Sequence, residues 1–179
     1  MDESIAKAAL FERIVTPHLD AAWNLARWLV RDQHDAEDVI QESCVRAFRF
    51  IDSYRGGDPK SWVLSIVRNV SHTLLRKNRG ARATVALDDQ ADAIEGTSMQ
   101  PLEHLEQQAS AEMLRTAIAR LPIEYREPLI LREFEQLSYK EIAQVTEVPM
   151  GTVMSRLARG RERLVAMLTA TETRKENQP

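Results

Sequence analysis

Residues 138–164 read SYKEIAQVTEVPMGTVMSRLARGRERL, and this stretch predicts two helices joined by a tight turn at residues 147–149. Ser138 and Glu141 have the spacing of a capping box, in which a serine oxygen and a glutamate carboxylate satisfy the first backbone donors of a helix. The residues expected to be buried, which recur at helical spacing, are Ile142, Val145, Val153, Leu157, Gly160 and Leu164. This order of elements is typical of a helix-turn-helix.

The exposed face of the second helix and its flanks carry short polar and arginine side chains near the start of the helix. The major groove of DNA admits one helix, and arginine can donate two hydrogen bonds to guanine O6 and N7. Threonine and the flanking arginines suit phosphate groups. The candidate DNA-binding residues are Thr152, Ser155, Arg156, Ala158, Arg159 and Arg163. The alternative is an ordinary solvated face on a helical hairpin.

Helical periodicity extends through most of the remaining chain, which predicts an all-α fold. The other expected helices span residues 14–30, 36–51, 61–76, 111–121 and 123–137. Pro122 suits the first turn of the last of these helices, and Pro128 either kinks that helix or marks a later start. The buried residues expected in the first half are Leu19, Ala22, Trp23, Ala26, Leu29, Val30, Ile40, Cys44, Ala47, Phe48, Ile51, Val63, Val67, Val70 and Leu74.

The charges are distributed unevenly along the chain, although its formal net charge is only −3. Residues 55–82 carry seven Lys and Arg against one acid, which suggests a surface for an anionic partner. Residues 83–112 carry seven acids and no Lys or Arg, with low hydrophobicity and no period, as in a linker. We expect two small helical domains at 1–82 and 111–170, joined by a flexible acidic linker at 83–110 and followed by a polar tail at 171–179.

Several classes of protein lack their signatures in this chain. Cys44 is the single cysteine, which excludes an internal disulfide and a CxxC pair, and the histidines show no ligand spacing. The common phosphate-binding, esterase and metalloprotease motifs are missing, so we expect no enzyme, no catalytic residues, no metal and no cofactor. No apolar run approaches the roughly 20 residues of a membrane helix. A cytoplasmic protein without membrane insertion is therefore the expectation.

The two halves together resemble the extracytoplasmic-function (ECF) sigma factors of bacterial RNA polymerase, small members of the sigma-70 family. Residues 35–50, DAEDVIQESCVRAFRF, resemble the part of region two that binds the polymerase. Residues 54–79, YRGGDPKSWVLSIVRNVSHTLLRKNR, resemble the part that opens DNA and reads the minus-ten element. Residues 121–164, which begin LPIEYREPLILREFEQ and end with the helix-turn-helix, resemble region four, which reads the minus-thirty-five element.

This resemblance implies a subunit without catalysis of its own. It would bind the clamp and flap regions of core RNA polymerase, direct the enzyme to promoters and assist opening, with contacts to duplex and single-stranded promoter DNA. Family members are commonly held inactive by a second protein, so an anti-sigma factor is an expected partner. The alternative is a stand-alone helix-turn-helix regulator that binds duplex DNA, which leaves the first half without a role.

An acidic ridge on the predicted helix 36–51 is the candidate polymerase surface. By position, Asp38, Gln41 and Glu42 match family residues that contact the clamp, and the carboxylates of Asp38 and Glu42 suit arginines of a partner. The alternative is a solvated face on which Glu42 and Arg46 form an intrahelical ion pair that stabilises the helix by about 0.3 kcal/mol.

The basic loop and helix after residue 53 are the candidate minus-ten surface. Strand opening needs a pocket for an unstacked base and cations that follow the single strand. The resemblance assigns these roles to Tyr54, Arg55, Gly56, Asp58, Arg68, Asn69, Arg76, Lys77 and Arg79. Trp62 is interpreted mainly as core packing.

Two positions depart from the family pattern. Met154 stands where family members are often basic, and Ala158 where they are often aromatic or histidine. The minus-thirty-five sequence therefore cannot be inferred by analogy, and recognition is expected to depend on Ser155, Arg156 and Arg159. A further hypothesis is that the acidic linker competes with DNA for the basic surfaces.

Overall fold

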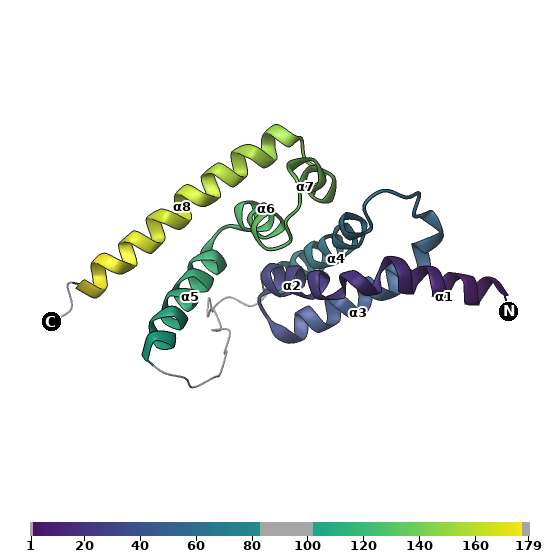
Figure 1. Ribbon diagram of the computed structural model, residues 1–179, viewed down its shortest axis with the longest axis horizontal. Coiled ribbons are helices and arrows are strands. Elements are labelled where there is room, and N and C mark those ends of the chain that lie inside the picture. Colours follow the sequence, from purple (N-terminus) through teal and green to yellow (C-terminus); the bar gives the residue numbers. More distant parts are fainter. Residues whose placement is uncertain (1, 83–101, 177–179) are drawn as a thin grey trace.

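The computed structural model describes residues 2–82 and 102–176, and every regular element in those two ranges is a helix. The all-α prediction is therefore confirmed. Figure 1 shows two groups of helices that lie against each other, with the termini at opposite ends of the molecule. We call residues 2–82 the first module and residues 102–176 the second module.

The first module contains α1 (Asp2–Ile14), α2 (Leu19–Val30), α3 (Gln33–Phe50) and α4 (Pro59–Arg82), with two short 3-10 turns, η1 (Thr16–His18) and η2 (Ile51–Ser53). The helix predicted at 14–30 is wrong at its start. Ile14 ends α1, the turn η1 follows, and α2 begins only at Leu19. Pro17 lies in that turn and lacks the N–H that a continuous helix needs. No helix was predicted at the position of α1.

The buried face of α3 lies one position away from the predicted one. Ala36, Val39, Ser43 and Ala47 are buried, whereas Phe48 is 40% exposed and stacks edge-on against Phe11 of α1. Small residues on this face let α3 pack on both α2 and α4. Trp23 was also predicted as buried and is 36% exposed. Trp28 of the same helix is buried instead.

The second module contains α5 (Leu102–Arg120), α6 (Ile123–Glu133), α7 (Tyr139–Thr146) and α8 (Met150–Glu176). Helix α5 begins within the predicted linker range 83–110, and α8 continues into the predicted tail 171–179. Residues 83–101 lie outside the described part of the chain. The predicted flexibility of the linker and its competition with DNA concern these residues. Helix α6 ends before residue 137 because Gln136 adopts a left-handed backbone conformation with φ 61°.

The helix-turn-helix is confirmed in α7 and α8. Ser138 Oγ accepts from the Glu141 N–H at 3.3 Å, and Glu141 Oε2 accepts from the Ser138 N–H at 2.7 Å, which completes the capping box. Glu147 ends α7 in a left-handed conformation, φ 55°. Gly160 is buried against α6, where an added Cβ would lie 3.4 Å from the Tyr125 carbonyl oxygen. The residues predicted to be buried, Ile142, Val145, Val153 and Leu157, lie in the core.

The two modules share one continuous hydrophobic core. Helix α6 packs on α2, and α7 packs on α4, as Figure 1 shows. Across this contact the rings of Trp28 and Phe134 lie 5.6 Å apart. The first helix of the helix-turn-helix thus lies on the helix that was predicted to bind minus-ten DNA.

We expect Ser138→Ala to lower the free energy of unfolding by about 1 kcal/mol, because the Glu141 N–H loses its acceptor, the Ser138 Oγ. Urea unfolding followed by circular dichroism measures this change. Gln144→Ala, at an exposed position of the same helix, is the control and should change stability by less than about 0.5 kcal/mol. Equal effects of the two substitutions would contradict the role of the cap.

Candidate nucleic-acid interface

The start of α8 presents an open face of polar side chains. Ser155, Ala158 and Arg159 are exposed, and Thr152 and Arg156 are half-buried beside them. Among the described residues, no ion pair engages Arg156 or Arg159. Both guanidinium groups are therefore available to an external acceptor, while the opposite face of α8 is held in the core.

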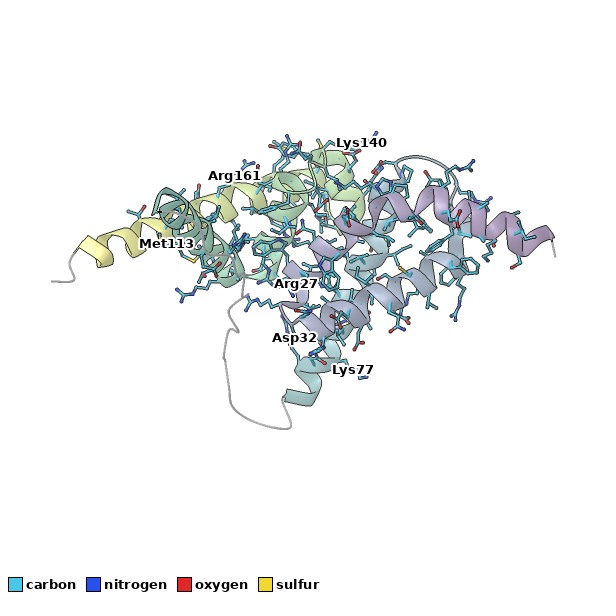
Figure 2. The ribbon with its side chains drawn as sticks, turned by 60° about the horizontal axis from the view of Figure 1, so that its bottom comes forward. Arg27, Asp32, Lys77, Met113, Lys140 and Arg161 are labelled. Atoms are coloured by element: carbon cyan, nitrogen blue, oxygen red, sulfur yellow. The ribbon has the colours of Figure 1, made fainter. Side chains whose placement is uncertain are left out.

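The next arginines of α8 are held by the second module itself. Arg161 donates to Glu133 at 2.6 Å, and this hydrogen bond raises the pKa of the arginine. Arg163 lies over the ring of Tyr125, 4.6 Å from its centroid. Of the predicted minus-thirty-five residues, Arg163 is thus engaged by a ring of the protein, and the Ser155 hydroxyl donates to the Thr152 carbonyl at 3.0 Å. Figure 2 shows Arg161 on α8, in a different module from Lys77 near the far end of α4.

The loop before α4 is built around two glycines in conformations that other residues rarely adopt. Gly56 and Gly57 have φ of 89° and 99°. The Tyr54 hydroxyl donates to the Gly57 carbonyl at 2.7 Å, and its ring packs against Trp62 at 5.5 Å. Arg55 is exposed at the tip. The loop is thus held from inside by Tyr54, with one cation directed to solvent.

Asp58 has a structural role at the start of α4. Its carboxylate accepts from the Ser61 N–H at 2.7 Å, as an N-cap does, and Pro59 occupies the first turn. Partial burial acts to raise the pKa of Asp58, but hydrogen bonds from Ser61 and Lys60 outweigh it and lower the pKa. The carboxylate predicted to serve the minus-ten pocket therefore first fixes the geometry of the loop.

One face of α4 carries cations along much of its length. Arg68, Arg76 and Arg79 follow one another at helical spacing, with His72 between the first two. Arg76, Lys77 and Arg79 are exposed, as is Asn69 on the flank. The part of this face toward the C-terminal end of α4 is therefore open to an anionic ligand.

Arg68 and His72 are covered by the second module. The Arg68 Nε donates to Glu127 Oε1 at 2.9 Å, and the His72 Nε2 lies 2.8 Å from the same oxygen. Glu127 belongs to α6 and is only 2% exposed. The structure thus separates Arg68 from the other predicted minus-ten cations, because its charge is already neutralised.

A second buried carboxylate, that of Glu135 in the second module, is bound by side chains of the first module. Glu135, 6% exposed, accepts from Lys60 Nζ at 2.9 Å and from Asn24 Nδ2 at 2.5 Å. Lys60 Nζ also donates to the Glu135 backbone carbonyl at 2.8 Å. Lys60 is therefore bound to both the side chain and the backbone of the same residue.

Arg126 joins the modules through backbone oxygens. Its guanidinium donates to Ala119 O at 2.8 Å in the second module and to Leu29 O at 3.3 Å in the first. Burial lowers the pKa of Arg126 to about 10, an effect that Arg31 strengthens and Glu127 opposes. The group remains charged at neutral pH, so the interface contains a buried cation as well as two buried carboxylates.

The predicted polymerase surface on α3 is exposed throughout. Asp38 and Gln41 face solvent, and Glu42 accepts from the Arg46 Nε at 2.6 Å. The intrahelical pair considered from the sequence is thus present, on an open surface. Val45 follows Gln41 and Glu42 on the same side of α3 and is 49% exposed, which makes the surface partly apolar. Cys44 lies on the other side of α3, and burial raises the pKa of its thiol.

Sequence reasoning missed the residues that form the contact between the modules, Lys60, His72, Arg126, Glu127 and Glu135. No local pattern marks them, because each depends on a partner far away in the chain. Val45 carried a usable signal, since an apolar residue amid an acidic helix face is unusual.

Nothing in the described ranges suggests a metal centre, since no cluster of three or more His, Cys, Asp or Glu side chains is found there. A search of the same ranges found no helix long and apolar enough to cross a membrane.

Two helical modules, one with a helix-turn-helix and the other with a basic helix and an acidic ridge, define a DNA-binding protein with an additional protein-binding surface. Family comparisons agree with this class. Residues 14–81 match the model for sigma-70 region 2, and residues 111–164 match the model for sigma-70 region 4. Both ranges lie within the predicted domains 1–82 and 111–170.

Relatives with assigned functions are similar over most of the chain. The sigma factor SigE of Mycolicibacterium smegmatis is 34% identical over 154 residues, 86% of this chain and 60% of that protein. The sigma-H factor of Pseudomonas aeruginosa is 32% identical, covering 85% of this chain and 82% of that protein. The ECF sigma-E factor of Salmonella typhimurium is 33% identical, covering 90% and 94%.

Solved structures show the same fold. The sigma factor RpoE in its complex with the anti-sigma factor NepR, from Bartonella quintana, matches 89% of this chain and 96% of its own, with a TM-score of 0.75 and 26% identity. CnrH in complex with the cytosolic domain of CnrY matches 93% of this chain and 97% of its own, with a TM-score of 0.61 and 25% identity.

The chain therefore belongs to the sigma-70 family and is an ECF RNA polymerase sigma factor that serves transcription initiation. Sigma factors bind core polymerase and promoter DNA and are not enzymes, as predicted. The match of residues 14–81 to region 2 decides against a stand-alone helix-turn-helix regulator.

We expect Asp58→Ala to destabilise the first module by about 1 kcal/mol through loss of the cap of α4. Because the folded-state pKa is lowered, the charged cap contributes fully above pH of about 4 and is lost as the pH falls through the folded-state value. Thermal melting from pH 7 downward measures this loss. Asp58→Asn caps without titrating and is the control, so an equally steep acid dependence in that variant would contradict the assignment.

Proposed function

We propose that each of the exposed faces described above binds a different ligand of a sigma factor: the minus-thirty-five element, the minus-ten element or core polymerase. Helix α8 enters the major groove of the minus-thirty-five element, with Arg159 and Ser155 at base edges and Thr152 and Arg156 toward phosphates. The observation that carries this proposal is the open face of α8, on which Arg159 is exposed and no ion pair engages it within the described residues. Arg163 contributes from its place over Tyr125.

The loop before α4 and the open part of α4 serve the minus-ten element. Arg55 lies at the tip of a loop whose shape depends on Tyr54, Gly56 and Asp58. Asn69 lies on the flank of the helix where an unstacked base would lie, and the exposed cations Arg76, Lys77 and Arg79 suit the phosphates of a single strand. Arg68 belongs to the same face but is paired with Glu127 in this structure.

The ridge on α3 binds core polymerase at its clamp. Asp38 and Glu42 supply charge for basic residues of the partner, Gln41 supplies hydrogen bonds, and exposed Val45 supplies apolar contact. The second module binds the flap, and the protein works in the bacterial cytoplasm. An anti-sigma factor is a further proposed partner, since both solved neighbours described above are complexes with a second protein, named as an anti-sigma factor in one of them.

Charge reversal on the ridge tests the polymerase proposal. We expect Asp38→Lys with Glu42→Lys to weaken binding to core polymerase by about tenfold or more, because like charges replace a complementary pair. Fluorescence titration against core enzyme measures the affinity. Glu12→Lys with Asp20→Lys makes the same charge change at exposed positions outside α3 and is the control. Equal binding by native protein and the ridge variant would refute the assignment.

Replacement of Arg159 tests the reading of the minus-thirty-five element. We expect Arg159→Ala to reduce discrimination between a selected duplex and its scrambled version by about 1 to 3 kcal/mol. The duplex is obtained by selection from random sequences with holoenzyme, and binding is compared for both. Arg161→Ala, whose side chain is engaged by Glu133, is the matched control. A uniform loss on all sequences would assign Arg159 to a phosphate.

A further inference from the structure

The contact between the modules has an unusual chemistry, because the hydrogen-bond and ion-pair partners of its two buried acids lie across the interface. Glu127 is bound by Arg68 and His72, and Glu135 by Lys60 and Asn24. All four partners belong to the first module, and within the described residues neither carboxylate has a hydrogen bond or ion pair in its own module. Both acids therefore depend on the closed arrangement.

This dependence makes the contact sensitive to charge. A buried carboxylate without a partner is strongly disfavoured, so the interface is stable only while its cations remain in place. When the modules separate, water replaces those cations at both acids. Opening the contact therefore solvates both carboxylates, and this offsets part of the cost of exposing the apolar residues that the two modules share.

The cations on α4 suit a second anionic ligand equally well. A guanidinium donates to phosphate oxygens with the same geometry that it uses for carboxylates. Arg68 lies on the helix face that continues through Arg76 and Arg79. Its Nε donates to Glu127 at 2.9 Å, and the whole Arg68 side chain is only 16% exposed beside the second module. DNA and the second module therefore compete for the same side chain.

We propose that Glu127 and Glu135 form a carboxylate latch, which closes the N-terminal half of the basic face of α4 against single-stranded DNA until the modules separate. This inference rests on the proposed minus-ten role of α4. Lys60 and His72 become additional phosphate-binding residues once the latch opens. The latch thus couples DNA binding to module separation, because single-stranded DNA binds the open form better and shifts the population toward it.

The open part of the face suggests the order of events. Arg76, Lys77 and Arg79 are exposed in the closed form and can bind a strand first. A phosphate that then reaches Arg68 displaces Glu127, which weakens the remaining contacts of α6 with α2. The affinity of the closed protein for DNA is reduced by the fraction of molecules that are open.

Removal of the two latch charges tests the proposal. Glu127→Gln with Glu135→Gln keeps the shape of both side chains and neutralises both carboxylates. We expect a larger radius of gyration in small-angle scattering and about tenfold tighter binding of a labelled single-stranded oligonucleotide of mixed sequence. Glu133→Gln is the matched control, because its carboxylate pairs with Arg161 inside the second module. It should change neither quantity.

A second variant covers the case in which the double substitution unfolds the chain, which circular dichroism would reveal. Lys60→Gln removes one cation of the latch from the first module. This variant is judged by its radius of gyration alone, which should increase, because Lys60 is itself a proposed phosphate-binding residue of the open form. An unchanged radius in the folded variants overturns the latch, as does expansion of the double glutamine variant without any gain in DNA affinity.

Failure of the latch and failure of the proposed function give different results. Arg76→Ala with Lys77→Ala removes exposed cations and leaves the carboxylates in place. If this variant loses oligonucleotide binding while the latch variants bind no better than native protein, α4 binds DNA and the latch is wrong. If it binds as native protein does, the minus-ten role of α4 is wrong, and the latch loses its basis.

Discussion

Burial of Glu127 between the modules is the constraint on which the rest of the arrangement depends. A carboxylate that is 2% exposed needs its charge compensated, and the structure supplies Arg68 and His72 from α4. Those partners determine where α6 lies, and the position of α6 determines which part of α4 is open. The polar contact thus controls the exposure of a basic surface.

The same contact separates the functional surfaces into two kinds. The recognition face of α8 and the ridge around Asp38 are open and need no rearrangement before they meet a partner. The start of the basic face of α4 is covered. Under the proposed assignments, the closed form can bind core polymerase and duplex DNA, while contact of a melted strand with Arg68 requires the modules to move apart.

Local sequence patterns predicted much of the fold, with errors where packing decides. The capping box at Ser138 and the core residues of α7 and α8 were predicted correctly, because helix caps and three- and four-residue spacing act within a few residues. The buried face of α3 was shifted, because its contacts favour small Ala36 and Ser43 over large Phe48. The exposed site residues of α3 and α8 follow from helical geometry alone.

The sequence by itself determined an all-helical chain with a helix-turn-helix, a basic helix and a resemblance to sigma factors, since each of these is encoded in short-range spacing or local composition. Only the tertiary structure decided that Arg68 is neutralised while Arg159 remains free of ion pairs in the described residues. Glu127 and Arg68 lie 59 positions apart, and no local pattern encodes a pairing over that distance. Their contact arises from packing of the two modules, which depends on the summed shape and charge of both surfaces.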